Sequence, residues 1–414
     1  MISPAFESHI RDTVRLWLGL RPDQVELVPI MPAGLCDLLF RREEWDQGPR
    51  DQWGNWEHGL ADNYQRGRLW WPEVDDWLEG VRAGLPAAAR PLPLWPEAKR
   101  FAVLLTHDVD LVSEEVTVGQ LLRRCRIPNR SAPLRTLYSL ASRRIRYRAW
   151  PDLDPMLGTA SEIERQLGVK ASYFFTYHTV FDRQEFDCCY LPGDPCRFRG
   201  ERQRIRDAMR LLYQDGHDIG LHGSYRSALD GVLLRREREQ MAAETGLPIS
   251  TTRQHWLHWG PLTPRHQEAA GLIADTTLGY NRNIGFRCGT SLPFESFDRE
   301  LDRPIRVLQV PLHIQDGALF NSSGLELDEA TAQRVCETIM DRVAAVGGVL
   351  SLLFHPDALV RPPVRRLFEH LIRAGLEGGA WFATLREVHD WWRRRAAVLA
   401  APTGASPMLV GAGE

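Results

Sequence analysis

A short apolar run followed at once by polar side chains is the feature that most constrains the fold of this 414-residue chain. Residues 101–105 read Phe-Ala-Val-Leu-Leu, which is typical of a parallel strand buried on both faces. Thr106, His107, Asp108 and Asp110 follow where that strand would leave its sheet, and parallel α/β folds build their sites at this end of the strands. Asp108 and Asp110 would point the same way in an extended segment, so the pair predicts a cation or a shared proton between them.

Strands and helices are expected to alternate after this run, which implies parallel pairing with right-handed crossovers. Strands are predicted at 170–177, 218–222, 249–253, 272–275, 305–313 and 348–354, and helices at 161–167, 201–214 and 229–245. Gly168 is a suitable cap for the first of these helices. The fold class predicted for residues 99–397 is therefore α/β, a distorted (β/α) barrel.

The chain outside this barrel divides into three further parts. Residues 1–98 are predicted to form a small N-terminal α/β accessory domain, with helices at 10–20 and 74–83, a strand at 25–32 and a Trp- and Pro-rich arm. Residues 111–150 are predicted to be a basic helical insert, and its arginines would form a solvated face or meet an anionic lipid or glycan. Residues 398–414 are expected to be a flexible tail.

Composition narrows the class of protein. The chain has 51 basic and 54 acidic residues, so its overall charge does not favour nucleic acid as a partner. Seven cysteines, odd in number and scattered, do not resemble a secreted disulfide framework, and Cys188, Cys189 and Cys196 lack the spacing of a zinc finger. The apolar runs typical of a signal peptide or a membrane-spanning helix are not seen, so we expect a cytoplasmic protein without stable membrane insertion.

Each later predicted strand also delivers a polar residue at its end. The ends carry His222, the pair Arg253 and His255, Asp275, and His355. A single histidine would more often be a hydrogen-bonded structural residue than a ligand. Their occurrence at successive strand ends instead predicts one site that combines a metal with acid and base groups.

These motifs resemble, in order, those of the polysaccharide deacetylases, carbohydrate esterases with a NodB-homology domain. Thr106-His-Asp-Val-Asp110 looks like the first motif of branches with an Asp-x-Asp sequence. The resemblance implies that Asp108 is the general base and Asp110 a metal ligand. It further implies that His222 is a ligand and that Arg253 orients the base. His355 would be the general acid, with Asp275 as its orienting partner.

One position departs from the family pattern. The second motif, His-x-x-x-His, corresponds to His222-Gly-Ser-Tyr-Arg226, and an arginine side chain has no lone pair for a metal. His255, two residues after Arg253, is the predicted substitute ligand, with His258 in reserve. An Asp-His-His set suits a divalent metal, with zinc as the expectation.

The resemblance implies a metal-dependent hydrolase that removes the acetyl group of an N-acetylated sugar or glycan. Two alternatives remain open from the sequence: a C–N hydrolase acting on a small non-sugar amide, and a catalytically inactive glycan-binding module. Retention of Asp108, Asp110, Arg253, Asp275 and His355 together favours an enzyme, because binding alone requires neither an acid nor a base.

Overall fold

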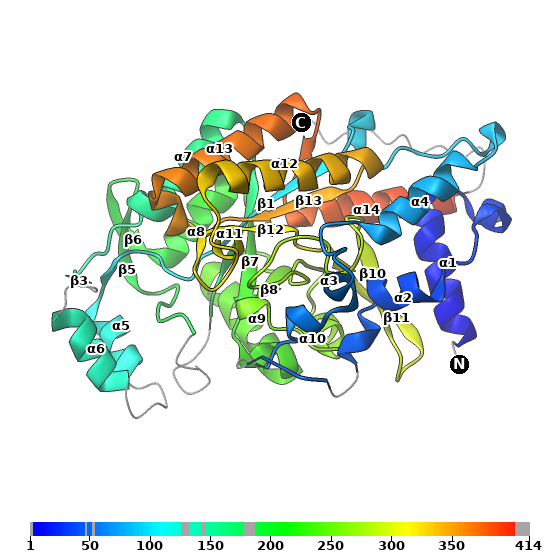
Figure 1. Cartoon of the computed structure of the whole chain (residues 1–414). Coiled ribbons are helices and arrows are strands. Elements are labelled where there is room, and N and C mark those ends of the chain that lie inside the picture. Colours follow the sequence, from blue (N-terminus) through cyan, green and yellow to red (C-terminus); the bar gives the residue numbers. More distant parts are fainter. Residues whose placement is uncertain are drawn as a thin grey trace.

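The fold is centred on a ten-stranded sheet with strand order β10-β11-β9-β8-β7-β4-β1-β13-β12, in which β14 pairs with β1 beside this path. The structure, a computed structural model, describes residues 3–45, 48–51, 54–125, 132–141, 146–177 and 187–401 (Figure 1). The strands of this sheet are β1 (Ala102–Asp108), β4 (Ala171–Phe175), β7 (Asp218–Gly223), β8 (Thr251–Gln254), β9 (Ala274–Asp275), β10 (Phe294–Asp298), β11 (Arg303–Gln309), β12 (Ile314–Gln315), β13 (Val349–Leu353) and β14 (Trp381–Phe382).

Most of the sheet is parallel, as the alternation of strands and helices predicts. Every neighbouring pair from β11 to β12 runs parallel, and β10 joins the edge as the antiparallel partner of β11. In the described residues no ladder joins β10 to β12, so the sheet stays open. The predicted distorted α/β barrel is therefore confirmed, in an open form.

The strand that begins the site is buried as its sequence indicates. All seven residues of β1 are buried, and β1 pairs with β13 on one side and with β4 on the other. The carboxyl end of β1 therefore lies in the middle of the sheet, where neighbouring strands can add side chains to the same site.

Helices cover the sheet, and in Figure 1 α12 and α13 run beside each other above β1 and β13. The helices that follow the first strand of the sheet are α5 (Val118–Cys125), α6 (Ala132–Ala141), α7 (Thr159–Leu167), α8 (Ile205–Gln214), α9 (Gly231–Thr245), α10 (Thr263–Ala269), α11 (Asp316–Phe320), α12 (Glu329–Val346), α13 (Pro362–Glu377) and α14 (Leu385–Ala400). Gly168, the predicted cap, ends α7 at φ 69°, a backbone conformation that glycine adopts without strain. No helix of the described residues has both the length and the apolar character that a membrane crossing requires.

Three predicted elements differ from those observed. Residues 25–32 were expected to be a strand, but Pro22–Leu27 is a 3-10 helix whose start is fixed by Pro22 and by the side chain of Gln24, which accepts from the N–H of Arg21. Residues 201–204 were expected to begin a helix but form β6 (Glu201–Arg204), which pairs with β5 (Pro195–Phe198) in a separate hairpin. The strand expected over 305–313 ends at Gln309, and β12 then begins on the opposite edge of the sheet.

The N-terminal residues pack directly on the sheet. Their helices are α1 (Pro4–Leu18), α2 (Ala33–Leu39), α3 (Asp62–Gln65) and α4 (Glu73–Ala83). Phe6 and Trp17 of α1 belong to the same apolar cluster as Phe294 and Leu308 of the sheet, and the indole N–H of Trp17 donates to the carbonyl of Pro293. The predicted domain boundary at residue 98 stays a prediction.

The basic insert is helical, with a small strand pair at its base. The two helices α5 and α6 pack against each other, and β2 (Glu115–Val116) pairs with β3 (Arg146–Tyr147) where the insert leaves and rejoins the sheet domain. Figure 1 shows α5 and α6 at one end of the molecule, away from the sheet. A flexible tail was predicted for residues 398–414. Residues 398–400 belong to the end of α14, and residues 402–414 lie outside the described residues.

Candidate active site

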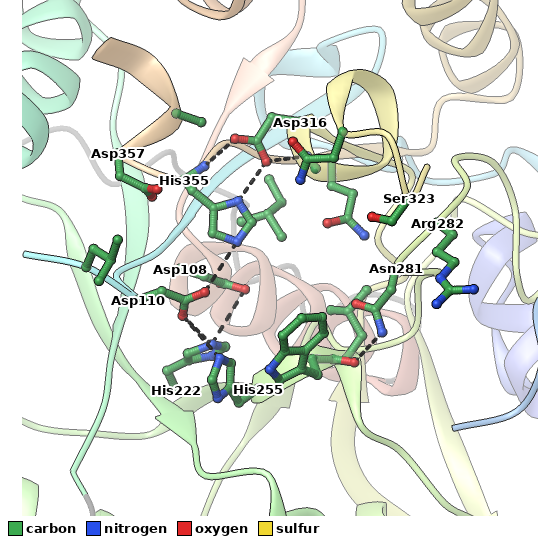
Figure 2. A pocket seen from close by; sticks show the side chains of 18 of the residues that line it. Asp108, Asp110, His222, His255, Asn281, Arg282, Asp316, Ser323, His355 and Asp357 are labelled. Atoms are coloured by element: carbon green, nitrogen blue, oxygen red, sulfur yellow. Dashed lines mark hydrogen bonds and ion pairs between the residues drawn. The ribbon is translucent and has the colours of Figure 1, made fainter. Parts of the chain in front are cut away.

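The candidate site lies in a cavity of about 550 Å³ at the carboxyl ends of the central strands. This volume is typical of cavities that bind small ligands. Figure 2 shows two carboxylates from the end of β1, the imidazoles of His222 and His255 below them, and the imidazole of His355 above. Because parallel strands end at one edge, residues far apart in the sequence meet here.

Asp110, His222 and His255 form a cluster whose three possible ligand atoms lie within 4.8 Å of one another. The Nε2 atom of His222 lies 3.1 Å from Oδ1 of Asp110, and the Nε2 atom of His255 lies 3.6 Å from the same oxygen. The cluster is the one predicted from the sequence, including His255 as the third member.

Hydrogen bonds at Nδ1 of both histidines leave the two Nε2 atoms, which face Asp110, available to bind a metal. Nδ1 of His222 lies 2.8 Å from the carbonyl oxygen of Arg253, which can only accept, so Nδ1 carries the hydrogen. Nδ1 of His255 lies 3.1 Å from Oδ1 of Asp187, a carboxylate. The cluster thus offers two Nε2 atoms and a carboxylate oxygen to one point, and an acceptor behind each imidazole orients its ring. This arrangement fits a divalent metal such as zinc.

Asp110 and His255 stabilise each other's charged form, and a divalent cation held by the cluster would take the place of the proton on Nε2 of His255. Burial by itself would lower the pKa of His255, but the carboxylates of Asp110 and Asp187 raise this pKa to about 10. Burial by itself would raise the pKa of Asp110, but His255 and His222 hold that pKa well below its usual range. Asp110 is therefore ionised, as a metal ligand must be.

Asp108 points into the same cavity from the other side of the cluster and is bound to a buried arginine. Nη1 of Arg253 donates to Oδ1 of Asp108 at 3.0 Å and to the hydroxyl of Thr106 at 2.7 Å. The remaining donors of Arg253 go to the carbonyl and hydroxyl of Thr276, at 2.9 Å and 3.1 Å. The fully buried guanidinium is thus fixed by three residues and places a positive charge beside Asp108.

His355 follows β13 and is oriented by Asp316, not by Asp275. Its Nδ1 lies 2.7 Å from Oδ1 of Asp316, and its backbone N–H donates to Oδ2 of the same carboxylate at 3.0 Å. Asp275 instead accepts from the hydroxyl of Thr277 at 2.5 Å. The expectation that Asp275 orients His355 is wrong for this structure, because the strand end that faces His355 is β12 and not β9.

The environment of His355 favours its protonated form. Burial by itself would lower the pKa of His355, but the charge and hydrogen bond of Asp316, together with the charges of Asp110 and Asp108, raise it well above the ordinary value. The Nε2 atom of His355 faces the cavity, 3.8 Å from Oδ2 of Asp110. His355 can therefore deliver a proton to a group bound beside the cluster.

Arg226, His258 and Cys196 lie outside the cluster, whereas Cys188 contacts it. Arg226 is exposed at the start of a 3-10 turn, and the imidazole of His258 stacks on the ring of Tyr225 with 4.0 Å between ring centroids. Cys196 belongs to β5, but the thiol of Cys188 lies 3.7 Å from Oδ1 of Asp110. The predicted substitution of Arg226 by His255 in the cluster is consistent with this arrangement.

Trp256, at the rim of the cavity, has an unusual backbone conformation. Trp256, directly after His255, lines the cavity and has φ 59°, which is rare for a residue with a side chain. Two amides hold its carbonyl oxygen: Nδ2 of Asn55 donates at 3.1 Å and Nδ2 of Asn281 at 2.6 Å. The N-terminal part of the chain thus helps to shape the cavity.

Two residues of this site were not found in the sequence. Asp316 follows a strand of two residues, and the only usable signal was its position after an apolar stretch that ends in His313-Ile-Gln. Asp187 lies in an irregular segment and carried no signal.

The chain therefore combines an open, mostly parallel α/β sheet with an Asp-His-His cluster at its carboxyl edge, a candidate metal centre. No protein-family model matches the chain, and no curated protein matches it. A putative polysaccharide deacetylase from Mycobacterium smegmatis is similar over 76% of this chain and 97% of its own, with 18% identity and a TM-score of 0.49.

Two further solved structures show a similar degree of likeness. Puue allantoinase matches with 15% identity over 75% of this chain and 95% of its own, at a TM-score of 0.48. A probable polysaccharide deacetylase from Pseudomonas aeruginosa PAO1 matches with 16% identity over 74% of this chain and 96% of its own, at a TM-score of 0.46.

Proposed function

We propose that the protein is a metal-dependent hydrolase that removes an acetyl group from the nitrogen of an acetylated sugar or glycan. The observation that carries this proposal is the convergence of three sets of groups on one cavity: a ligand cluster, a carboxylate fixed by an arginine, and an imidazole fixed by a carboxylate. Hydrolysis of an amide needs these three functions, namely activation of the carbonyl and water, a base, and an acid.

Asp110, His222 and His255 would hold the metal. A bound divalent cation, with zinc as our expectation, supplies a Lewis acid for the acyl carbonyl and lowers the pKa of a nearby water. Asp108 then takes the proton of the attacking water. Arg253 keeps Asp108 in place through its hydrogen bond to Oδ1.

His355 completes the reaction on the leaving side. As the C–N bond breaks, its Nε2–H protonates the departing amine, so that acetate and a free amine are the products. Asp316 holds the ring in place and stabilises its positive charge before the transfer. Base and acid together account for the two proton transfers, from water to Asp108 and from His355 to nitrogen.

The rest of the cavity supports a polar, ring-shaped substrate. Amide and hydroxyl side chains also line the cavity, and they are Asn281, Gln315, Asn321 and Ser323. Trp256 and Leu257 add an apolar surface. Alternating hydrogen-bonding groups and an apolar face suit a sugar, which has hydroxyls at its edge and C–H groups on its faces.

Metal analysis is the direct test of the cluster. Purified protein should bind one zinc or similar ion, and Asp110→Ala, His222→Ala and His255→Ala should each reduce the metal content. Asp341→Ala is a suitable control because Asp341 is exposed on α12. Unchanged metal content in all three variants would show that the cluster is not a metal site.

Acetate release separates the proposed activity from its alternatives. N-acetylated oligosaccharides should be deacetylated, and Asp108→Asn should lower kcat by roughly 10²- to 10⁴-fold while metal content stays the same. Sugar binding that persists in wild type and Asp108→Asn, without turnover in either, would indicate a binding module. Turnover of small non-sugar amides with no acetate from any sugar would indicate the other C–N hydrolase.

A further inference from the structure

The helical insert presents apolar side chains to solvent on two helices. On α6, Leu134, Leu137 and Tyr138 are 70%, 61% and 63% exposed. On α5, Val118 and Leu122 are also more than half exposed. The spacings of three and four residues place these side chains on one face of each helix, so each face forms a stripe and not a scatter.

This concentration of exposed apolar side chains is unusual for the molecule. In the described residues, six of the large exposed apolar side chains lie between positions 118 and 147, and no stretch of similar length elsewhere holds as many. Single exposed apolar residues are ordinary on protein surfaces, but a group of them marks a surface that binds another molecule or a membrane. The sixth side chain, Tyr147, is on β3 beside the base of the helices.

The charge of the same stretch indicates what kind of partner covers this surface. Residues 117–149 contain nine arginines and no aspartate, glutamate or lysine, whereas the whole chain has a formal net charge of −3. Among the described residues of this stretch, Arg123 pairs with Asp194 and Arg148 with Glu115. The insert is therefore a strongly positive region on a chain whose remainder is acidic, and its partner should be anionic.

We propose that α5, α6 and β3 dock on the surface of an anionic lipid bilayer. Apolar stripes and tyrosines enter the boundary between headgroups and acyl chains, and arginines attract the anionic headgroups, which is how interfacial helices bind membranes. Self-association through this surface would bring two strongly positive regions together and is disfavoured by their repulsion. Nucleic acid would use the arginines but leave the apolar stripes exposed to water.

The insert is attached to the body beside the candidate active site. Nε of Arg123 donates to the carbonyl oxygen of Cys189 at 3.0 Å, and Nε2 of Gln120 donates to Asp194 at 3.2 Å. Cys188, the residue before Cys189, contacts Asp110 of the ligand cluster through its thiol. A docked insert therefore holds the cavity near the bilayer surface, while the docking itself does not depend on what the cavity hydrolyses.

Vesicle flotation with the full-length chain tests the proposal. Wild type should float with vesicles of phosphatidylcholine mixed with phosphatidylglycerol, and much less with phosphatidylcholine alone. The triple variant Leu134→Ser, Leu137→Ser, Tyr138→Ser should lose about tenfold or more in partitioning. The control variant Leu301→Ser, Val232→Ser, Leu376→Ser removes three exposed apolar side chains outside the insert and should bind like wild type.

Charge and folding are checked separately. Arg146→Glu reverses an exposed charge at the base of the insert and should weaken flotation, as should added salt. Equal thermal unfolding midpoints for all variants would show that they fold. The proposal is overturned if wild type does not float, if it floats equally with neutral vesicles, or if the triple serine variant floats like wild type.

The other possible occupants have their own signatures. Concentration-dependent dimerisation that the serine variant abolishes, without flotation, would assign the surface to a second copy. Retention of a single-stranded RNA probe by wild type, lost in Arg146→Glu and again without flotation, would assign it to nucleic acid. Either result would replace the bilayer as the partner.

Discussion

The Nδ1 atom of His255 lies 3.1 Å from a carboxylate oxygen of Asp187, so the candidate metal ligand is oriented from behind by a second acidic residue. The same oxygen accepts the backbone N–H of Tyr225 at 3.1 Å. Asp187 is 4% exposed, and its charge helps to raise the pKa of His255. A carboxylate behind a histidine ligand fixes the ring and increases its basicity.

Asp187→Asn should therefore weaken metal binding without removing a ligand. The amide can still accept from Tyr225, but it places no negative charge behind the ring. We expect an affinity for zinc about 10- to 100-fold lower, measured by competition with a chromophoric chelator. Asp341→Asn on the exposed face of α12 should leave the affinity unchanged. Equal affinities for wild type and Asp187→Asn would contradict a supporting role for Asp187.

Asp316 and Asp275 can be separated by matched substitutions. Asp316→Asn removes the charge that raises the pKa of His355, so the imidazolium should lose its proton at lower pH. The alkaline limb of the pH–kcat profile should shift to lower pH, and kcat should fall, by up to roughly 10²- to 10⁴-fold if the acid is lost entirely. Asp275→Asn should leave the alkaline limb in place, because Asp275 bonds Thr277. A shift in the Asp275 variant alone would restore the original assignment.

The contrast between Asp316 and Asp275 shows which parts of the candidate site could be predicted from the sequence. Asp108 and Asp110 come at the end of a strand with a clear apolar pattern, whereas the strands of His222 and His255 are largely polar, and the order of the motifs was needed to place these two histidines at the same sheet edge. The identity of β1 and the α/β fold class followed from the same patterns.

Asp316 could not be found this way because its position depends on a pairing between distant segments. The chain leaves β11 at Gln309, crosses to the other edge of the sheet, and pairs Ile314 with Leu352 and Gln315 with Leu353. Two residues are too few for a recognisable strand pattern. The carboxylate that faces His355 is consequently set by tertiary pairing, as is the position of Asp187 in an irregular segment.

Glu237 makes stability depend on pH. Burial raises the pKa of Glu237 to about 8, although its carboxylate accepts the N–H of Ser224 at 3.1 Å. Because the folded-state pKa is raised, the contribution of Glu237 to stability is fully present below its unfolded pKa of roughly 4.3 and is lost as pH rises through about 8. Each unit of that difference corresponds to about 1.4 kcal/mol.

Glu237→Gln should remove this dependence. Urea unfolding of wild type should show stability falling from about pH 4 to about pH 8 and levelling off above, and the glutamine variant should show a flatter profile and be the more stable protein at high pH. Glu239→Gln, an exposed position on the same helix, should follow wild type. Parallel profiles for Glu237→Gln and wild type would show that Glu237 is not the group responsible.

Glu44 tests how the N-terminal residues are joined to the sheet domain. Its carboxylate is completely buried between two arginines, with Nε of Arg41 at 2.7 Å and Nη2 of Arg287 at 2.6 Å. Glu44→Gln leaves the buried Arg287 without its counterion and Arg41 with Glu43 alone, which should cost about 3–5 kcal/mol in urea unfolding. Asp37→Asn breaks the exposed pair with Arg42 and should cost at most about 1 kcal/mol.

The shape of the same transition addresses the predicted boundary at residue 98. Arg287 belongs to the segment that also carries Asn281, whose amide holds the carbonyl of Trp256 at the cavity rim. If the network joins both parts into one cooperative unit, Glu44→Gln should shift a single tryptophan-fluorescence transition as a whole. Two transitions, of which the substitution moves only the earlier, would instead mean that residues before 98 unfold as a separate domain. In that case the cavity rim should lose order first, and metal should be retained through the earlier transition.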